Sequence, residues 1–531
     1  MQPNFLLFIT DQQRADHVGS YGNAMLRTPT LDALAAQGWS ADRFYVGSPI
    51  CMPNRATLMT GRMPSVHGVR HNGIPLSQRA TTFVERLRGA GYATALIGKS
   101  HLQNMTGKGP LWPPPPSSGS IPSHGEAWAA EPGNYDQEWG PLWRSDPGHD
   151  LDTPFYGFDR VVLAVDHGDQ VWGHYGRWLA REHPEARRRW GPEHALPAPD
   201  FVLTQHQQAW RTRVPEECST TAYIGDQTIA QLREHAASGA PFFLQCSFPD
   251  PHHPYTPHGK YWDMYRPEDV ALPASFHASA AAGHAPPPHV AWLYQQRDQG
   301  KAVKHTPAVF ACTEREAREA IALNYGSISH IDATIGRVMQ TLRDTGLDDN
   351  TVVIFTSDHG DYFGDHQLML KGPIHYQGLI RTPFIWRDPQ SKPAAARSQA
   401  LCSTADIAAT ILARAELPDY NGMQGMSLLP LMAGVVDTVR DAVLIEEESQ
   451  RTMFGFPSRT RMRTLQTSRH RLSVYADAGW GELYDLQEDP DELRNLWDAP
   501  AAAATRGELL FALSKAMIRH AETSPHPTAI A

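Results

Sequence analysis

Short apolar segments rich in β-branched and aromatic residues recur along the chain, and patterns typical of helices lie between them. Each segment is apolar enough to be buried on both faces of a sheet. Strands that alternate with helices predict an α/β fold with a large, mostly parallel sheet flanked by helices. The expected strands are Asn4–Thr10, Ala93–Gly98, Pro241–Phe248 and Thr351–Ser357. The expected helices are Thr30–Gln37, Thr82–Ala90, Thr221–Ala237 and a long one over 314–345.

The chain is expected to form two domains, because its 531 residues can bury a large core and a second, smaller one. Residues 1–435 contain the alternating segments, whereas short strands and turns after about residue 436 predict a smaller α+β domain over 436–531. Two segments rich in Pro, Gly, Trp and His, 103–215 and 262–310, do not follow the alternation. We expect them to form lids and pocket walls, and their tryptophans favour ordered walls.

Charge and cysteine usage exclude several classes of protein. A net charge of -10 and a pI near 6.2 argue against a nucleic-acid-binding surface, which needs clustered Lys and Arg. We see no signal peptide at residues 1–10 and no run long enough to span a bilayer, so we expect a cytoplasmic protein without membrane contact. Scattered cysteines without paired spacing fit a reducing compartment: Cys51, Cys218, Cys246, Cys312 and Cys402.

Two of the expected strands end in acidic residues. The first strand runs into Asp11-Gln12, and the strand over 351–357 runs into Asp358-His359. In open α/β sheets, ligands bind just beyond the carboxyl ends of the strands. A single Asp at such a place often only caps the next helix, but two together with a histidine favour a divalent cation site.

Cys51 begins the sequence CMPNRATLMTGR, over residues 51–62. A zinc site would need a second cysteine two to four residues away, and this chain has none there. The spacing from the thiol to Arg55 is too short for a cysteine phosphatase loop. The pattern resembles the type I sulfatase motif, Cys-x-Pro-x-Arg followed by Thr-Gly. In that family the cysteine is oxidised to formylglycine, the aldehyde whose hydrate is the nucleophile.

Further motifs in the family's order extend this resemblance over most of the chain. They are the first strand with Asp11, TPTLD at 28–32, GKSH at 98–101, SDHG at 357–360, KG at 371–372 and LYDL at 483–486. The chain is therefore identified as resembling the arylsulfatase and phosphonate monoester hydrolase branch of the alkaline phosphatase superfamily, which implies an alkaline-phosphatase-like fold.

The resemblance also implies one divalent metal ion. Its ligands by position are Asp11, Asp358, His359 and the modified Cys51. Many members have a second Asp where this chain has Gln12, whose amide oxygen can still coordinate. With an imidazole among the oxygen ligands, both Ca²⁺ and Mn²⁺ remain open.

The resemblance assigns roles to several other residues. Lys99 and His101 match residues that contact the aldehyde hydrate and the sulfuryl oxygens, and strand alternation is expected to point both to one face. Arg55 holds the hydrate or an anion. His252 is expected to protonate the leaving group, with neighbouring His253 as the alternative.

Two more residues complete the set. Lys371 matches a lysine that binds the transferred group. Asn72 matches an asparagine of the phosphonate hydrolase and choline-sulfatase branches, although a plain Asn-Gly turn is equally consistent with it.

The expected activity is hydrolysis of aryl or small alkyl sulfate esters, after maturation by a formylglycine-generating enzyme. The metal and three cationic side chains would neutralise the ester oxygens while the hydrate attacks sulfur. Hydrolysis of phosphonate monoesters or phosphodiesters is the alternative, suggested by Gln12 and Asn72. A non-catalytic anion-binding protein with an unmodified Cys51 is the third reading. The tail His520–Ala531 could pack on a second subunit of a homo-oligomer.

Overall fold

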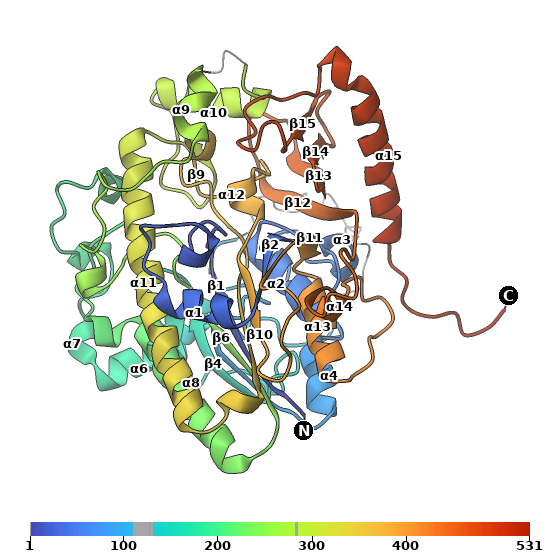
Figure 1. Cartoon of the computed structure of the whole chain (residues 1–531). Coiled ribbons are helices and arrows are strands. Elements are labelled where there is room, and N and C mark those ends of the chain that lie inside the picture. Colours follow the sequence, from blue (N-terminus) through green and yellow to red (C-terminus); the bar gives the residue numbers. More distant parts are fainter. Residues whose placement is uncertain (1, 110–126, 128–130, 282–284, 531) are drawn as a thin grey trace, which may run out of the picture.

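The computed structural model describes residues 2–109, 127, 131–281 and 285–530. Within these residues a nine-stranded sheet runs through the larger part of the molecule, and helices cover both of its faces (Figure 1). Its order is β11 (Arg397–Ser403), β2 (Trp39–Tyr45), β10 (Phe384–Arg387), β8 (Thr351–Ser357), β1 (Asn4–Thr10), β6 (Phe242–Ser247), β3 (Ala93–Gly98), β4 (Arg160–Val165) and β5 (Trp172–Gly173). The run from β8 to β4 is parallel, whereas β10 and β5 are antiparallel to their neighbours. The prediction of a mostly parallel sheet is confirmed.

The central strands are buried on both faces, as their apolar sequences predict. In β1, Phe5, Leu7 and Ile9 enter one core, while Leu6 and Phe8 enter the other. Burial of these side chains on both faces is the main source of stability for such a sheet. The first core packs against α2 (Cys51–Thr60), α4 (Phe83–Gly89) and α13 (Asp406–Arg414). The second packs against α1 (Pro29–Gln37), α6 (His174–Glu182), α8 (Thr220–Ser238) and α11 (Glu314–Asp344).

The predicted boundaries of several elements coincide with those observed. Strands β1, β3 and β8 begin and end at the expected residues, and β6 is shorter by one residue at each end. Helix α4 begins after Thr82, whose side chain forms a capping box with Glu85. Helix α11 begins in the same way after Thr313. These caps satisfy backbone N–H groups that have no partner within the helix.

The expectation that segment 103–215 lies outside the alternation was wrong in one part. Within it, β4 is a parallel neighbour of β3 in the central sheet. The run RVVLAV of β4 is apolar, but the surrounding Pro, Gly and Trp residues concealed it. Residues 110–126 and 128–130, and 282–284 of the second segment, lie outside the described residues. The described helices of the two segments are α5 (Gly140–Ser145), α6, α7 (Pro184–Arg187), α9 (Ser275–Ala281) and α10 (Pro288–Asp298).

The C-terminal part contains an antiparallel sheet, in line with the α+β domain expected over 436–531. Its strands are β12 (Ala442–Thr452), β13 (Arg459–Thr467), β14 (His470–Tyr475) and β15 (Gly481–Asp485). Helix α15 (Ala503–Arg519) lies along this sheet (Figure 1) and packs on it through Leu509, Leu513 and Ala516. The first residues beyond α15 still contact the body, because Glu522 pairs with Arg62 and the Thr523 carbonyl accepts from Asn421. The rest of the tail extends away from the body (Figure 1), and its packing on a second subunit stays a prediction.

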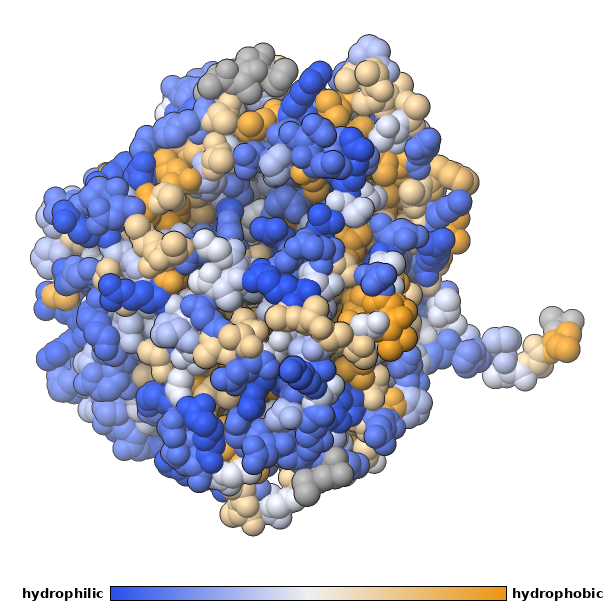
Figure 2. All heavy atoms as spheres, in the orientation of Figure 1, coloured by the Kyte–Doolittle hydropathy of each residue, from blue (hydrophilic) through white to orange (hydrophobic). Residues whose placement is uncertain are grey.

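The molecular face in Figure 2 is largely hydrophilic, and its apolar side chains form separate small groups. Exposed polar side chains of this kind are expected for a chain with a net charge of -10. Among the described residues, we find no helix with the length and apolar character needed to cross a bilayer.

Candidate active site

The expected site residues meet at the carboxyl edge of the parallel strands. Asp11 follows β1, Lys99 follows β3, and Asp358 with His359 follows β8. Beyond β6 the chain continues to His252 and His253, which lie between two cis X-Pro bonds, Asp250-Pro251 and His253-Pro254. Parallel strands bring their carboxyl ends to one side of the sheet, which explains how residues far apart in sequence converge.

Cys51 occupies the first position of α2, and every residue of that helix is buried. The helix ends at Gly61, whose φ of 61° is the left-handed conformation that glycine adopts without strain. Burial and Asp11 raise the pKa of the Cys51 thiol, but the opposing effect of Lys371, His359 and Lys99 is larger. The net result is a pKa lowered to about 7. A thiol is thus held at the positive end of a helix among three cationic groups.

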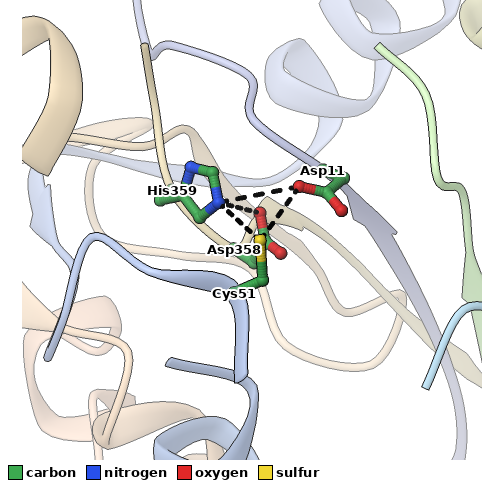
Figure 3. A group of neighbouring side chains, drawn as sticks. All are labelled: Asp11, Cys51, Asp358 and His359. Atoms are coloured by element: carbon green, nitrogen blue, oxygen red, sulfur yellow. Dashed lines mark hydrogen bonds and ion pairs between the residues drawn. The ribbon is translucent and has the colours of Figure 1, made fainter. Parts of the chain in front are cut away.

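Figure 3 shows Asp11, Cys51, Asp358 and His359 pointing toward one another. Their ligand atoms all lie within 4.8 Å of one another, and all four residues are buried. The Cys51 Sγ is 3.1 Å from His359 Nε2 and 3.8 Å from Asp11 Oδ1. Buried carboxylates with an imidazole form a donor set that fits a divalent cation such as Ca²⁺ or Mn²⁺.

Gln12 lies beside this donor set, with the oxygen of its amide directed toward Lys371. The Lys371 Nζ donates to Gln12 Oε1 at 3.0 Å. The amide nitrogen of Gln12 donates to His253 Nδ1 at 3.0 Å and also to Asp361. The oxygen, which is the atom able to coordinate a cation, thus contacts the same ammonium that contacts Cys51 Sγ.

Lys371 joins the nucleophile position to the expected proton donor. Its Nζ is 3.2 Å from Cys51 Sγ, 2.9 Å from His252 Nε2 and 3.1 Å from His359 Nε2. Among the described residues, Lys371 forms no ion pair with a carboxylate, although only 6% of its surface is exposed. A buried ammonium without a carboxylate is well placed to bind an anion.

Arg55 and Lys99 neutralise the carboxylates. Arg55 Nε donates to Asp358 Oδ2 at 2.8 Å, and Lys99 Nζ forms an ion pair with Asp11. Burial would raise the pKa of Asp11, but Lys99, His252 and Arg55 hold it well below its usual range. The Asp11 carboxylate is therefore anionic, and Arg55 places a positive charge beside the Asp358 carboxyl group.

The two histidines after β6 are both buried and stack on each other, with ring centroids 4.1 Å apart. His252 reaches Lys371, whereas His253 reaches Gln12. Burial lowers the pKa of His252 well below its usual range, and His167 and Lys371 lower it further. The structure thus brings His252 nearer to the anion-binding lysine, and its role as proton donor stays a prediction.

The strand-alternation argument for Lys99 and His101 was wrong. Strand β3 ends at Gly98, and His101 has a φ of 60°, so the backbone has left the extended conformation. His101 is buried near Lys99, and its backbone N–H donates to Glu138 at 2.7 Å. Burial and Lys99 lower the pKa of His101 well below its usual range. Its Nδ1 has no hydrogen-bond partner among the described residues.

Two asparagines support the segment around Cys51. Asn72 Oδ1 accepts from the Met52 N–H at 3.0 Å, so it holds the first turn of α2. Asn54 Oδ1 accepts from the Gly47 N–H at 2.9 Å, and its amide nitrogen donates to the carbonyl oxygen of Asp358. Asn54 therefore ties α2 to the loop that carries Asp358.

Sequence reasoning missed three residues of this site. His167 follows β4 and contacts Lys99, with 2.7 Å between its Nε2 and Lys99 Nζ. Asp361 accepts from Gln12. Glu138 accepts from the backbone N–H groups of residues 101–103. The apolar run of β4 followed by an acidic residue and a histidine was the signal for His167.

Comparison with known proteins was consistent across sequence and structure. The sulfatase family model matches residues 3–417, and a model described as N-sulphoglucosamine sulphohydrolase, C-terminal, matches residues 364–519. An arylsulfatase of Clostridium perfringens is 28% identical over 512 residues, which cover 93% of this chain and 90% of that protein. A choline-sulfatase of Rhizobium meliloti is 26% identical over 519 residues, covering 96% and 85%.

A phosphonate monoester hydrolase of Agrobacterium radiobacter has a crystal structure similar to this one, with a TM-score of 0.74 and 26% identity. The likeness covers 98% of this chain and 97% of that one, and it confirms the alkaline-phosphatase-like α/β fold. The sulfatase match covers most of the chain and includes the segment around Cys51. The chain therefore belongs to the sulfatase family of sulfuric ester hydrolases.

Proposed function

We propose that the protein hydrolyses aryl or small alkyl sulfate esters with a formylglycine made from Cys51. The observation that carries this proposal is the position of the Cys51 Sγ, 3.1 Å from His359 Nε2 and 3.2 Å from Lys371 Nζ. A set of candidate metal ligands thus meets, at one sulfur, an ammonium that pairs with no carboxylate of the described residues. The hydrate of the aldehyde would supply one hydroxyl for attack on sulfur and a second whose ionisation releases sulfate.

We also propose that Asp11, Asp358, His359 and the oxygen of Gln12 hold one Ca²⁺ or Mn²⁺ ion. Both carboxyl groups are buried, and the pKa of Asp11 is held well below its usual range, which fits a cation of either kind. The ion would supply Lewis acidity for the attacking oxygen and positive charge for the ester oxygens.

The chain's own cations and histidines then have separate tasks. Lys371, without a carboxylate partner among the described residues, binds a sulfuryl oxygen. Lys99 neutralises a second oxygen, and Arg55 fixes Asp358 in place. These groups are buried, so each interaction with developing charge is stronger than it would be in water. The pKa of free His252 is low, but the negative charge of a bound ester beside it would favour the imidazolium form, which then protonates the departing alcohol.

Phosphonate monoester or phosphodiester hydrolysis is a second candidate. It is favoured by the likeness to the Agrobacterium radiobacter hydrolase and by Asn72, which binds the first turn of α2. Lys99 favours sulfate esters, because a second buried lysine matches the classical sulfatase pattern. Rates on paired sulfate and phosphonate esters of one phenol would rank the two activities in a single preparation.

Mass spectrometry of the tryptic peptide Phe44–Arg55 tests the nucleophile directly. The protein would be made with and without a formylglycine-generating enzyme, and its metal content measured by elemental analysis. We expect the thiol-to-aldehyde mass change, one divalent ion per chain, and sulfate ester hydrolysis only in the converted sample. A peptide that stays a thiol with the converting enzyme present, in a protein that still binds sulfate, would instead identify an anion-binding protein.

A further inference from the structure

The same four residues, Asp-His-Gly-Asp, follow two different strands of the parallel sheet. They occupy 358–361 after β8 and 166–169 after β4. Both strands also begin with a charged or polar residue and two valines. Only the first copy contributes to the donor group drawn in Figure 3. The second copy has no role in the function proposed above.

Both copies direct their histidine at the same carboxylate, that of Asp11. His359 Nε2 lies 3.6 Å from Asp11 Oδ1, and His167 Nε2 lies 3.4 Å from Asp11 Oδ2. The final aspartate of each copy anchors its turn. Asp361 accepts from the Phe363 and Leu370 N–H groups. Asp169 accepts from the Gly191 N–H and from Thr212.

The two sides of Asp11 differ in the first aspartate of the turn. Asp358 is buried in the donor group, whereas Asp166 has a φ of 87° and a side chain that is 44% exposed. Asp166 Oδ1 lies 3.5 Å from His167 Nδ1 and accepts from its backbone N–H. The opposite ring nitrogen, Nε2, faces the Lys99 ammonium, which is a donor only, so Nε2 lies where it can accept from Lys99.

The cation on this second side of Asp11 is the ammonium of Lys99. Its Nζ lies 2.7 Å from His167 Nε2 and forms the ion pair with Asp11. Asp11, His167 and His252 could also form a metal-ligand group. Because Lys99 contacts two of those three residues, a metal ion there would meet a like charge at close range.

We propose that His167 is a positioning residue that holds the Lys99 ammonium against the sulfuryl group. This inference rests on the proposed function, because it gives Lys99 the task of binding a sulfate oxygen. His167 also supports the expected proton donor, since its ring stacks on His252 with centroids 3.8 Å apart. The turn after β4 thus positions an ammonium through its histidine, whereas the turn after β8 supplies a histidine to the candidate metal site.

Two substitutions separate the acceptor from the ring. His167→Phe keeps a flat ring against His252 but removes the acceptor for Lys99. His167→Gln keeps an oxygen near the position of Nε2 but removes the ring. Inorganic sulfate, titrated calorimetrically into the metal-loaded and unconverted protein, reports the position of Lys99 without catalysis. We expect His167→Phe to weaken sulfate binding about tenfold, and His167→Gln to weaken it by less than about threefold.

A double-mutant cycle with Lys99→Met tests whether His167 acts through Lys99. In the Lys99→Met background, His167→Phe should change sulfate affinity by no more than about twofold. His277→Phe, on the exposed surface of α9, is the matched control, and thermal unfolding checks that each variant is folded.

Equal sulfate affinity in His167→Phe and the native protein would overturn the inference, as would the same loss with and without Lys99. Failure of the proposed function looks different, because the native, converted protein itself would then neither bind sulfate nor hydrolyse its esters. The kcat/KM of converted protein should follow the sulfate affinities of the variants.

Discussion

Two regions of this molecule bury charge in opposite ways. In the C-terminal sheet, the fully buried Arg471 pairs with Glu482, 3.1 Å from its Nη2, and with Glu492. At the edge of the central sheet, the buried Lys371 contacts an amide, a thiol and two imidazoles. In the first arrangement the buried cation has carboxylate partners within the protein. In the second, the buried cation has none among the described residues, so a bound anion can supply the opposite charge. Buried charge therefore serves folding in one region and anion binding in the other.

Removal of the nucleophile should affect only the second region. Cys51→Ala leaves the metal ligands and Lys371 in place, so the melting temperature should stay close to the native value. Sulfate ester hydrolysis should fall by at least about 10⁴-fold, as for other enzymes that lose the nucleophile. Initial rates on an aryl sulfate and calorimetry of the same samples check both parts. Residual turnover within tenfold of the native rate would mean that another group attacks sulfur.

Loss of Arg471 should damage stability more than any change at the active site. Arg471→Met leaves Glu482 and Glu492 buried without a counter-charge, which should lower the free energy of unfolding by about 3–5 kcal/mol. Urea unfolding monitored by tryptophan fluorescence measures this loss. Arg469→Met is the control, because that arginine pairs with Asp485 at the surface. Equal losses in both variants would contradict the comparison.

Lys371→Met should have the reverse profile. The kcat/KM for sulfate esters should fall by about 10²–10³-fold, because a positive charge at the transferred group is lost. Stability should be unchanged or higher, since the substitution removes a buried ammonium that pairs with no carboxylate of the described residues. Parallel assays of kcat/KM and of urea unfolding would measure the loss of activity and the change in stability. A large loss of stability would mean that Lys371 has a structural role instead.

A buried histidine at the junction of the two regions predicts acid sensitivity. His67 ends α3 (Pro64–His67), accepts from the Val69 N–H and lies 3.1 Å from Thr57 Oγ1. Burial, with Arg62 nearby, lowers its pKa to about 3. Because the folded pKa is below the unfolded value of 6.5, the unfolded chain takes up the proton first. Stability is therefore complete above pH 6.5 and is lost as the pH falls toward 3.

This one group should cost about 2 kcal/mol between pH 6.5 and pH 5. Urea unfolding at both pH values measures the slope. His67→Gln can make the same two hydrogen bonds without titrating, so its stability should change less over that interval. An equal slope in the variant would assign the acid sensitivity to other groups.

The middle of the central sheet, strands β8, β1, β6 and β3, could be predicted from the sequence, because strands buried on both faces are apolar along their whole length. The strands toward the β11 edge could not. Strand β2 carries Asp42 and Arg43, and β11 begins with three polar residues, Arg397 to Gln399. Such strands lack the continuous apolar run on which the prediction depends. The error at β4 had a different cause, namely the composition of the segment around it.

Site residues that belong to the sulfatase-like motifs could be predicted from the sequence. Asp11, Cys51, Asp358 and His359 meet as the resemblance implied, although their individual roles stay predictions. His167 could not be assigned in this way, since its position depends on β4 joining β3 in the sheet. Contacts between residues so far apart in sequence are fixed by the tertiary fold.

The burial of Cys51 also bears on whether the proposed conversion of this residue precedes or follows folding. Only 1% of this residue is exposed, and all of α2 is buried with it. The conversion proposed above requires an enzyme to reach this thiol, which the folded protein does not expose. On that proposal oxidation competes with folding, and a molecule that folds first would keep its thiol. The active fraction of a preparation would then be decided during synthesis, by the relative rates of two processes, and would not rise afterwards.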